Sequence, residues 1–319
     1  MAGGQERILR GRIKSVQSTK KITKAMELIA ASRIVKAQAR LAAARPYSER
    51  ITDVIRNLGT AGAGRGQPLL ESRPQIGTVG YLSITSDRGL SGSFSSGVIR
   101  QTERLTEVDR AEGRRTKLFV VGKKGIGYFR FRDVAMEESF LGVIDKPTYE
   151  NAKEIAAAVT PAFESGAVDA VDIVFNQFLS AGSQRLVVRR LLPIDTEALA
   201  EAPTGPTADY EFEPSADGIL AELLPRYVEA RIFAALLDSS ASFHAFQQRA
   251  MKAASDNADE LVKTLSRVMN RARQDTITTE IMEIVSGAEA LRQAKRPGED
   301  LLLDVVQYSG LSNPRSSQN

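Results

Sequence analysis

The sequence predicts an α/β protein in which a mostly parallel five-stranded sheet is inserted between long N- and C-terminal helices that pair as an antiparallel coiled coil. Residues 226–286 contain neither Gly nor Pro and are rich in residues that favour helices. Residues 12–45 also lack Gly and Pro. Between these two stretches, short β-rich apolar runs alternate with helical segments, a pattern that is typical of a parallel sheet.

The N-terminal helix is predicted over residues 1–60. Pro46 is expected to bend this helix near Arg45 without ending it, because the apolar spacing resumes beyond Pro46. The glycine-rich run 59–64 ends the helix. Its apolar stripe follows three-and-four spacing with gaps at Ser, Thr and Lys, and consists of Ile13, Val16, Ile22, Met26, Ile29, Leu41, Ala44, Ile51, Val54, Ile55 and Leu58.

The middle of the chain, residues 61–214, is predicted to form a Rossmann-like domain with an antiparallel strand at one edge. Strands are predicted at 77–86, 117–121, 134–141, 171–178 and 184–192, and helices at 94–108, 123–132 and 149–164. The last two strands are close in sequence and are expected to form a hairpin. Pro203, Gly205, Pro206 and Pro214 indicate a loop before the next long helix.

The C-terminal helix is predicted over residues 215–293, and residues 294–319 form an extension beyond it. Spacings of four and three, with one step of five, give its apolar stripe a mean period near 3.5, which indicates winding around a partner helix. A helix of this length would extend on the order of 90 Å. The two terminal stripes can therefore cover each other only side by side. The C-terminal stripe consists of Ala254, Ala258, Leu261, Leu265, Val268, Ala272, Ile277, Ile281, Ile284, Ala288 and Leu291.

Composition excludes several kinds of function. The chain has no Cys, which removes disulfides, thiolate metal sites and Cys nucleophiles. No apolar run approaches the roughly 18 residues of a membrane span, and the first residues do not resemble a signal peptide. The net charge of +4 is unevenly distributed, because residues 1–60 carry 13 Lys and Arg against 4 Asp and Glu. An acidic partner is therefore expected at the N-terminal helix.

The residues that could form a catalytic or cofactor site are better explained by structural roles. The glycine-rich turns 87–94 and 122–127 follow predicted strands but match neither the P-loop nor the dinucleotide-binding pattern. The single His, His244, is expected to be a packed or surface residue. Asp256, Asp259 and Glu260 are expected to form a solvated acidic face beside Lys252 and Lys263. We expect no catalytic residue, metal or cofactor.

Three partners would explain the basic N-terminal helix. Its cations are interleaved with Ala and Ile, and not with the aromatic residues of a single-strand nucleic-acid binder. Its apolar stripe also lacks the Trp and Phe of a helix that lies on a membrane surface. Acidic loops of a protein partner fit best, since a rigid rod with cationic patches can meet them in turn.

Three motifs resemble the gamma subunit of the rotary F-type ATP synthase. Residues 10–16 and 20–33 are similar to the opening of that family, and residues 270–281 and 283–288 are similar to its C-terminal signature. Residues 86–90 with Gly92 are similar to its middle motif. The resemblance covers roughly residues 5 to 291, and both terminal motifs are long enough to be specific.

The resemblance implies a rotor shaft that is not itself an enzyme. The helix pair enters a ring of three alpha and three beta subunits, and the globular domain stands on the membrane rotor ring (c subunits) beside the epsilon subunit. The asymmetric shaft couples proton transport to ATP synthesis or hydrolysis at the cytoplasmic face of the bacterial plasma membrane, with membrane contact only through the complex. The alternative is a nucleic-acid-tethering protein whose globular hinge domain caps an antiparallel coiled coil.

The resemblance also implies three sets of partner-binding residues. The first faces acidic loops of the beta subunits and consists of Lys20, Lys21, Lys24 and Met26. The second makes polar contacts with a beta subunit near the top of the shaft and consists of Arg273, Gln274, Thr278 and Glu280. The third lies near the epsilon subunit and the rotor ring and consists of Tyr210, Glu211, Phe212 and Glu213. The extension 294–319 is expected to contact the delta subunit or the collar of the ring.

Overall fold

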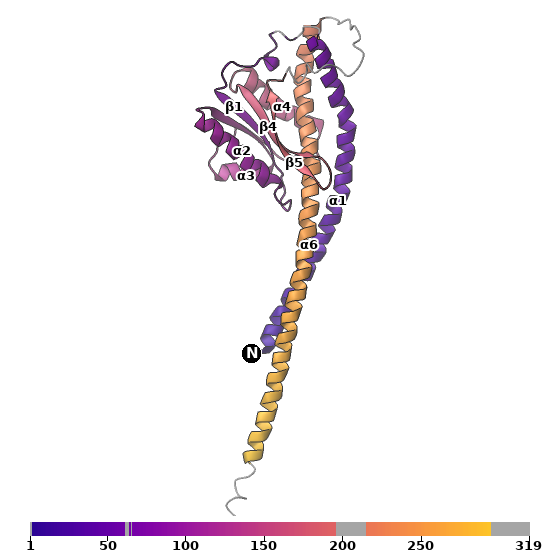
Figure 1. Cartoon of the computed structure of the whole chain (residues 1–319), viewed down its shortest axis with the longest axis vertical. Helices are drawn as coiled ribbons and strands as arrows, with labels where there is room; N and C mark the ends of the chain where they lie inside the picture. Colours follow the sequence, from indigo (N-terminus) through magenta and orange to yellow (C-terminus); the bar gives the residue numbers. More distant parts are fainter. Residues whose placement is uncertain (1, 61–63, 65, 196–214, 295–319) are drawn as a thin grey trace, which may run out of the picture. The chain divides into compact units, whose positions relative to one another are not determined.

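Two long helices and a five-stranded sheet make up the protein (Figure 1). The computed structural model describes residues 2–60, 64, 66–195 and 215–294. Helix α1 covers Ala2–Thr60 and helix α6 covers Ala216–Ala294. Of the described residues, 2–20 and 256–294 belong to one compact unit, and those between 21 and 255 form the other. Within the described residues, no helix is both long and apolar enough to span a membrane.

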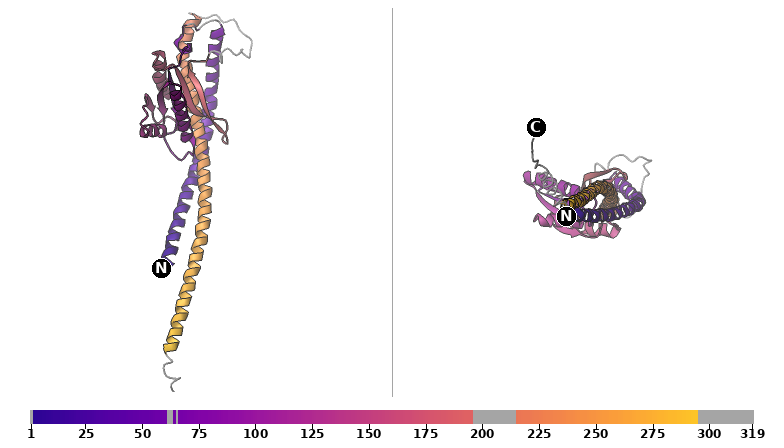
Figure 2. Two further views of the ribbon diagram at one scale, coloured as in Figure 1. Left: turned by 60° about the vertical axis from the view of Figure 1, so that its left-hand side comes forward. Right: turned by 90° about the horizontal axis from the view of Figure 1, so that it is seen from below.

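Both helices continue through a proline. Pro46 lies within α1, as the sequence predicts, and Pro225 lies within α6 near its start. A proline inside a helix removes one backbone hydrogen bond. The long stretches of good helix formers and the packing of one helix on the other keep these helices continuous. Within each unit, α1 lies beside part of α6, and α6 continues past the start of α1 (Figures 1 and 2).

The buried stripe of α1 follows spacings of four and three from end to end. All of its members are buried or half-buried: Leu9, Ile13, Val16, Lys20, Thr23, Glu27, Ala30, Ile34, Ala37, Leu41, Ala44, Ser48, Ile51, Ile55 and Leu58. The corresponding stripe of α6 consists of Met251, Ser255, Ala258, Val262, Leu265, Met269, Ala272 and Thr276. This spacing confirms the coiled-coil period that the sequence predicts.

The predicted stripes are wrong at several positions. Ile22, Ile29, Val54, Leu261 and Val268 are exposed, although each was expected to face the partner helix. The polar residues Lys20, Thr23 and Ser255 take part in the buried stripes instead. A prediction that counts only apolar side chains misses this, because polar groups remain in a seam where they find hydrogen-bond partners.

The sheet confirms the predicted topology. Its strand order is β3-β2-β1-β4-β5, with all neighbours parallel except the antiparallel pair β4 and β5. The strands are β1 (Thr78–Ile84), β2 (Arg115–Val121), β3 (Glu138–Phe140), β4 (Ala170–Phe178) and β5 (Gln184–Leu192). The connecting helices are α2 (Phe94–Ala111), α3 (Lys123–Phe131) and α4 (Tyr149–Glu164).

Strand β3 is shorter than predicted. Only Glu138–Phe140 pair with β2, whereas a strand was expected over 134–141. The first residues of that run end the preceding helix, since Asp133 has a φ of 52° and the Val134 amide donates to the carbonyl of Phe129. This turn uses the residues that would otherwise extend the strand.

Each face of the sheet has its own hydrophobic core. Leu118 and Val120 of β2 face α2 and α3 and pack with a cluster that includes Val98 and Phe129. Their neighbours Phe119 and Val121 belong to the cluster on the other face, which joins the sheet to α4, the end of α1 and the start of α6. The alternation along β2 therefore places α2 and α3 on one side of the sheet, and α4 with the long helices α1 and α6 on the other.

Candidate functional site

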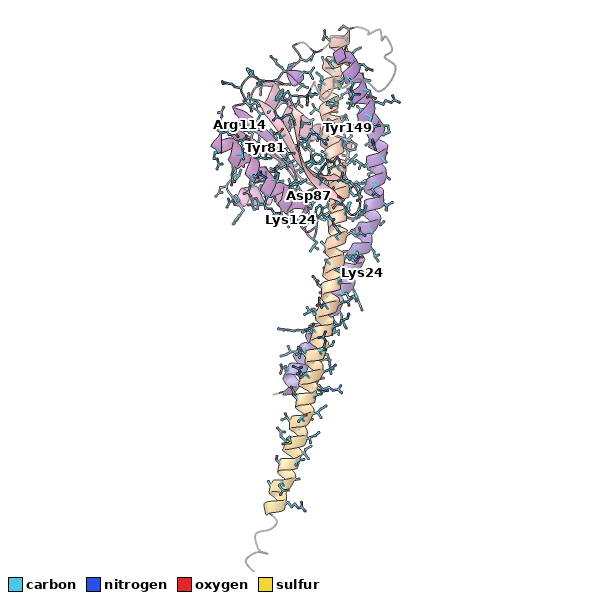
Figure 3. The ribbon with its side chains drawn as sticks, viewed as in Figure 1. Lys24, Tyr81, Asp87, Arg114, Lys124 and Tyr149 are labelled. Atoms are coloured by element: carbon cyan, nitrogen blue, oxygen red, sulfur yellow. The ribbon has the colours of Figure 1, made fainter. Side chains whose placement is uncertain are left out.

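The cationic residues predicted on α1 have different surroundings. Lys21 is exposed, and Met26 is half-buried. Lys24 is exposed on α1 (Figure 3) and forms an ion pair with Glu27 of the same helix at 3.0 Å. The Nζ of Lys20 donates to Asp259 Oδ1 of α6 at 2.5 Å. Lys20 is therefore engaged by the partner helix, while Lys21 and Lys24 face outward.

Asp259 is a residue whose role the sequence analysis missed. It was expected to belong to a solvated acidic face, yet it forms the ion pair with Lys20. Asp256 and Glu260 are exposed, so the predicted acidic face is confirmed for these two. One turn further, Thr23 Oγ1 and Ser255 Oγ form a buried hydrogen bond of 2.7 Å. A signal for both pairs exists in the sequence: polar residues occupy positions on the 3.5-residue period.

The C-terminal part of α6 extends beyond the start of α1. Because Lys20 meets Asp259 and the helices run in opposite directions, Ala2 lies level with about residue 277. Residues 277–292 are all exposed. The predicted stripe residues Ile277, Ile281, Ile284, Ala288 and Leu291 are therefore not covered by α1, which corrects the prediction.

This uncovered part of α6 carries a surface suited to a partner. Five large apolar side chains on it are 54–71% exposed: Ile281, Met282, Ile284, Val285 and Leu291. Arg273, Gln274, Thr278 and Glu280 are also exposed, just before and at the start of this surface. Clustered exposed apolar side chains mark interaction surfaces. The predicted residues Tyr210, Glu211, Phe212 and Glu213 lie outside the described residues.

The two glycine-rich turns pack against each other. A Cβ on Gly122, which has a φ of 95°, would lie 2.1 Å from the carbonyl oxygen of Thr85. The Oγ1 of Thr85 accepts a hydrogen bond from the Gly125 amide at 2.9 Å. Asp87 accepts one from the Lys123 amide, and Asp87 and Lys124 lie at the same edge of the sheet (Figure 3). These contacts support the structural interpretation, because the glycines allow close approach of two loops.

Two titratable groups of α6 have shifted pKa values: His244, which is buried, and Asp238, which is half-buried. Burial, aided by the charge of Arg33, lowers the pKa of His244 to about 4, and its Nδ1 has no hydrogen-bond partner within the described part of the chain. Burial raises the pKa of Asp238 to about 6, against the hydrogen bond that it accepts from the Phe178 amide at 3.2 Å. His244 is therefore a packed residue, as the sequence predicts. No group of three or more His, Cys, Asp or Glu within the described ranges has the arrangement of a metal site.

Acidification is expected to change the contributions of His244 and Asp238 to the free energy of unfolding in opposite directions. Neutral His244 stabilises the fold fully above its unfolded pKa of about 6.5, and this contribution is lost as the pH falls toward 4. Ionised Asp238 destabilises the fold above pH 6, and this cost disappears as the pH falls toward the unfolded pKa of about 3.9. Each shift corresponds to about 3 kcal/mol, so the two changes nearly cancel.

Single variants are expected to separate the two effects. On lowering the pH from 7 to 4, Asp238→Asn should lose about 3 kcal/mol more stability than the unchanged chain, and His244→Gln about 3 kcal/mol less. Urea unfolding followed by far-UV circular dichroism measures both. Glu222→Gln, which removes an exposed carboxylate from the same helix, is the control. Identical pH profiles for all three variants would contradict this account.

Comparison with known proteins identifies the family. A family profile described as ATP synthase matches residues 5–291. The ATP synthase gamma chain of Frankia casuarinae is 53% identical over 293 residues, covering 90% of this chain and 98% of the relative. The gamma chain of Mycolicibacterium smegmatis is 48% identical over 303 residues, covering 91% and 98%.

Solved structures share the fold. A chain of the central stalk and c-ring of the Tetrahymena thermophila mitochondrial ATP synthase matches with a TM-score of 0.57 and 26% identity, covering 73% of this chain and 99% of that chain. A chain of the Euglena gracilis mitochondrial ATP synthase, solved with OSCP, F1 and the c-ring, matches with a TM-score of 0.66, covering 93% and 98%. At 17% identity the second shows the fold alone. The family match and the identities over nine-tenths of the chain show that this protein belongs to the ATP synthase gamma chain family, the non-catalytic central-stalk subunit of that complex.

Proposed function

We propose that the paired helices turn inside a hexamer of alpha and beta subunits and transmit rotation between the membrane rotor ring and the nucleotide sites. The observation that carries this proposal is the uncovered end of α6, where large apolar side chains, five of them 54–71% exposed, are not covered by α1. A single amphipathic helix with this much exposed apolar surface needs a surrounding partner. A hexamer that encloses the helix end supplies one.

The proposed contacts with beta subunits form two groups. Lys20, Lys21, Lys24 and Met26 on α1 meet acidic loops, and Arg273, Gln274, Thr278 and Glu280 on α6 make polar contacts nearer the tip. The exposure of Lys21, Lys24 and the four α6 residues supports this assignment. Lys20 contributes through the position it holds beside Asp259, because this pair leaves its side chain partly exposed.

The mechanism we infer is a coupling free energy carried by an asymmetric rod. Two helices are paired along α1, and α6 alone continues beyond it. A hexamer around this rod meets different surfaces on its different subunits. The three nucleotide sites then adopt different affinities, and rotation changes those affinities in sequence. The chain itself supplies shape and stiffness, and the chemistry belongs to its partners.

Further placements follow the same proposal. We assign residues 1–60 and 215–293 to the rod, 61–214 to the globular domain and 294–319 to an extension that contacts the delta subunit or the collar. Tyr210, Glu211, Phe212 and Glu213 are assigned to contacts with the epsilon subunit and the c-ring. The complex would lie at the cytoplasmic face of the bacterial plasma membrane. An image of the native complex tests these placements, since a globular domain far from the membrane ring would contradict them.

The family match does not support the alternative of a nucleic-acid-tethering coiled-coil protein. Co-purification tests the proposed partners, because the gamma chain should bring down stoichiometric ATPase subunits. Bound nucleic acid whose release depends steeply on salt would contradict this expectation.

Met26→Lys is expected to impair coupling more than hydrolysis. The substitution adds a cation at a half-buried position of α1, near Lys20 and Lys24. The added charge should change the electrostatic interaction with the acidic loops of the beta subunits and so hinder rotation. In inverted membrane vesicles, we expect ATP-driven proton pumping to fall about fivefold or more, a typical coupling effect, while ATP hydrolysis falls less than about twofold.

Two controls accompany the Met26→Lys measurement. Met26→Leu preserves the apolar volume, and Ala39→Lys adds the same charge at an exposed position of α1. Both should pump protons at close to the unchanged rate. Equal loss of pumping and hydrolysis in Met26→Lys would count against the placement of this residue at a beta-subunit contact.

A further inference from the structure

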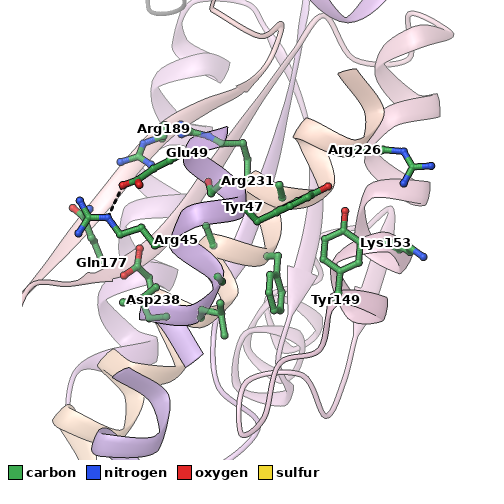
Figure 4. Close-up of a pocket in the computed structure, with 17 residues that line it drawn as sticks. Arg45, Tyr47, Glu49, Tyr149, Lys153, Gln177, Arg189, Arg226, Arg231 and Asp238 are labelled. Carbon is green, nitrogen blue, oxygen red and sulfur yellow. Dashed lines mark hydrogen bonds and ion pairs between the residues drawn. The ribbon is translucent and has the colours of Figure 1, made fainter. Parts of the chain in front are cut away.

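A cavity of about 850 Å³ lies within the unit formed by residues 21–255 (Figure 4). Its walls come from α1, α4, β4, β5 and α6. This volume lies in the range of small-molecule binding sites and is far larger than a free phosphate or sulfate ion needs. The cavity is distinct from the exposed rod surfaces to which we assign the beta-subunit contacts.

The charges around the cavity are unbalanced. Five cationic side chains line it, against the carboxylates of Glu49 and Asp238. Arg45 is paired with Glu49 at 2.7 Å. The other cations are Lys153, Arg189, Arg226 and Arg231. The lining therefore carries an excess of positive charge that an anionic ligand would neutralise.

Three of these guanidinium groups form no ion pair or hydrogen bond within the part of the chain that the structure describes: Arg189, Arg226 and Arg231. Arg189 and Arg231 lie over the rings of Phe175 and Tyr227. Burial and the neighbouring charge of Arg231 lower the pKa of Arg189, although the charge of Asp238 acts in the opposite direction. Repulsion between two like charges in a partly desolvated site is unfavourable, and a bound anion would offset it.

Aromatic rings form the other end of the cavity. Tyr149 packs edge-to-face against Tyr47 at 6.4 Å and against Phe233 at 5.6 Å between ring centroids. The Tyr149 hydroxyl donates to Glu229 at 2.7 Å, which fixes its ring. In Figure 4, Arg45, Arg189 and Gln177 gather at one end, and Tyr47 and Tyr149 lie toward the other, where Lys153 and Arg226 are also found. The cavity thus combines cationic groups with aromatic rings on which a planar ligand could stack.

We propose that this cavity binds an organic phosphate with a planar ring, of the nucleoside diphosphate or triphosphate class. The phosphates lie between the guanidinium groups of Arg189 and Arg231, because the planar guanidinium fork matches phosphate oxygens bidentately. The ring lies against Tyr47 and Tyr149, since aromatic side chains stack on bases. The site binds its ligand without reaction.

The first experiment measures binding to the full-length chain. Fluorescence anisotropy follows a titration with ADP that carries a fluorescent group on its ribose. We expect saturable binding that weakens about tenfold or more in Arg189→Gln/Arg231→Gln, since two phosphate contacts are lost. The matched control Arg100→Gln/Arg104→Gln removes two exposed arginines of α2 and should bind as the unchanged chain does. No saturable binding, or equal weakening in both double variants, would overturn the proposal.

A second variant guards against a folding defect. Arg226 is exposed, so Arg226→Gln should leave the thermal unfolding midpoint unchanged and still weaken binding. Photolabelling of the native complex with 8-azido-ADP locates the site, and a labelled peptide containing Tyr47 or Tyr149 is the expected result. If labelling of this chain is confined to peptides outside the cavity lining, the location is wrong.

Competition tests the class of ligand. Unlabelled ADP should displace the probe at a concentration about tenfold or more below that of pyrophosphate, because pyrophosphate lacks the ring. Equal displacement by pyrophosphate would overturn the assignment of the aromatic end. Vesicles of phosphatidylglycerol should not displace the probe. If they bind with the same dependence on Arg189 and Arg231 and ADP does not, the site recognises a lipid phosphate and the nucleotide class is wrong.

Discussion

Gly122→Ala is expected to destabilise the protein by more than about 4 kcal/mol, which is a large part of the 5–15 kcal/mol that a folded domain possesses. The added Cβ would lie 2.1 Å from the carbonyl oxygen of Thr85 and 2.5 Å from its carbonyl carbon. Both atoms belong to the backbone directly after β1, so no side-chain rotation relieves the clash. The φ of 95° adds strain for any residue with a Cβ.

Urea unfolding of the full-length chain measures this effect. Gly127→Ala is the matched control, because Gly127 lies within α3 and a Cβ there would meet nothing within 4 Å. Since alanine favours helices over glycine, this variant should gain about 0.5–1 kcal/mol. A Gly122→Ala variant as stable as Gly127→Ala would show that the two loops do not pack as described.

Phe94→Ala is expected to cost about 3–5 kcal/mol, with a further contribution from lost aromatic contacts. The Phe94 side chain is fully buried at the start of α2. Its ring packs edge-to-face against Phe243 at 5.6 Å and Phe246 at 5.9 Å between centroids, both on α6. Truncation would leave a cavity where the sheet domain meets the long helix within the same unit.

The control for Phe94→Ala is the same substitution at Phe131. That residue is 84% exposed at the end of α3, so its truncation should change stability by less than about 0.5 kcal/mol. The double variant Phe94→Ala/Phe243→Ala should be less destabilised than the sum of the single variants, because the two rings share one contact. Strict additivity would argue against direct packing between them.

Much of the fold was predictable from local patterns. The order of strands and helices between residues 78 and 192, and the hairpin of β4 and β5, follow from alternating apolar runs and helical spacing. The two long helices follow from the scarcity of Gly and Pro. The shorter extent of β3 was not predictable, because the turn at Asp133 depends on a left-handed backbone conformation that the sequence does not indicate.

The exact faces of the long helices were harder to predict. Ile22 and Thr23 are adjacent, and hydropathy favours burial of Ile22, yet Thr23 is buried because Ser255 supplies its hydrogen-bond partner. The exposure of Ile281 and its neighbours depends on where α1 begins relative to α6. Such relations between residues more than 200 positions apart are properties of the pairing, and one helix alone does not contain them.

The two proposed sites differed in how far the sequence revealed them. The partner-binding residues on α1 and α6 came from motifs that resemble a known family, and the family is now shown. The cavity gave no such signal. Its lining residues are contributed by five elements between Leu41 and Asp238, and only the folded chain brings Arg189 of β5 beside Arg231 of α6.

The ion pair between Lys20 and Asp259 and the hydrogen bond between Thr23 and Ser255 have a mechanical consequence. A purely apolar seam repeats every seven residues, so one helix can slide along the other by about 10 Å and restore similar contacts. Here such a slide would break the buried hydrogen bond between Thr23 and Ser255 and would separate Lys20 from Asp259. These polar contacts therefore oppose sliding of one helix along the other. Torque applied to one helix is then transmitted to its partner.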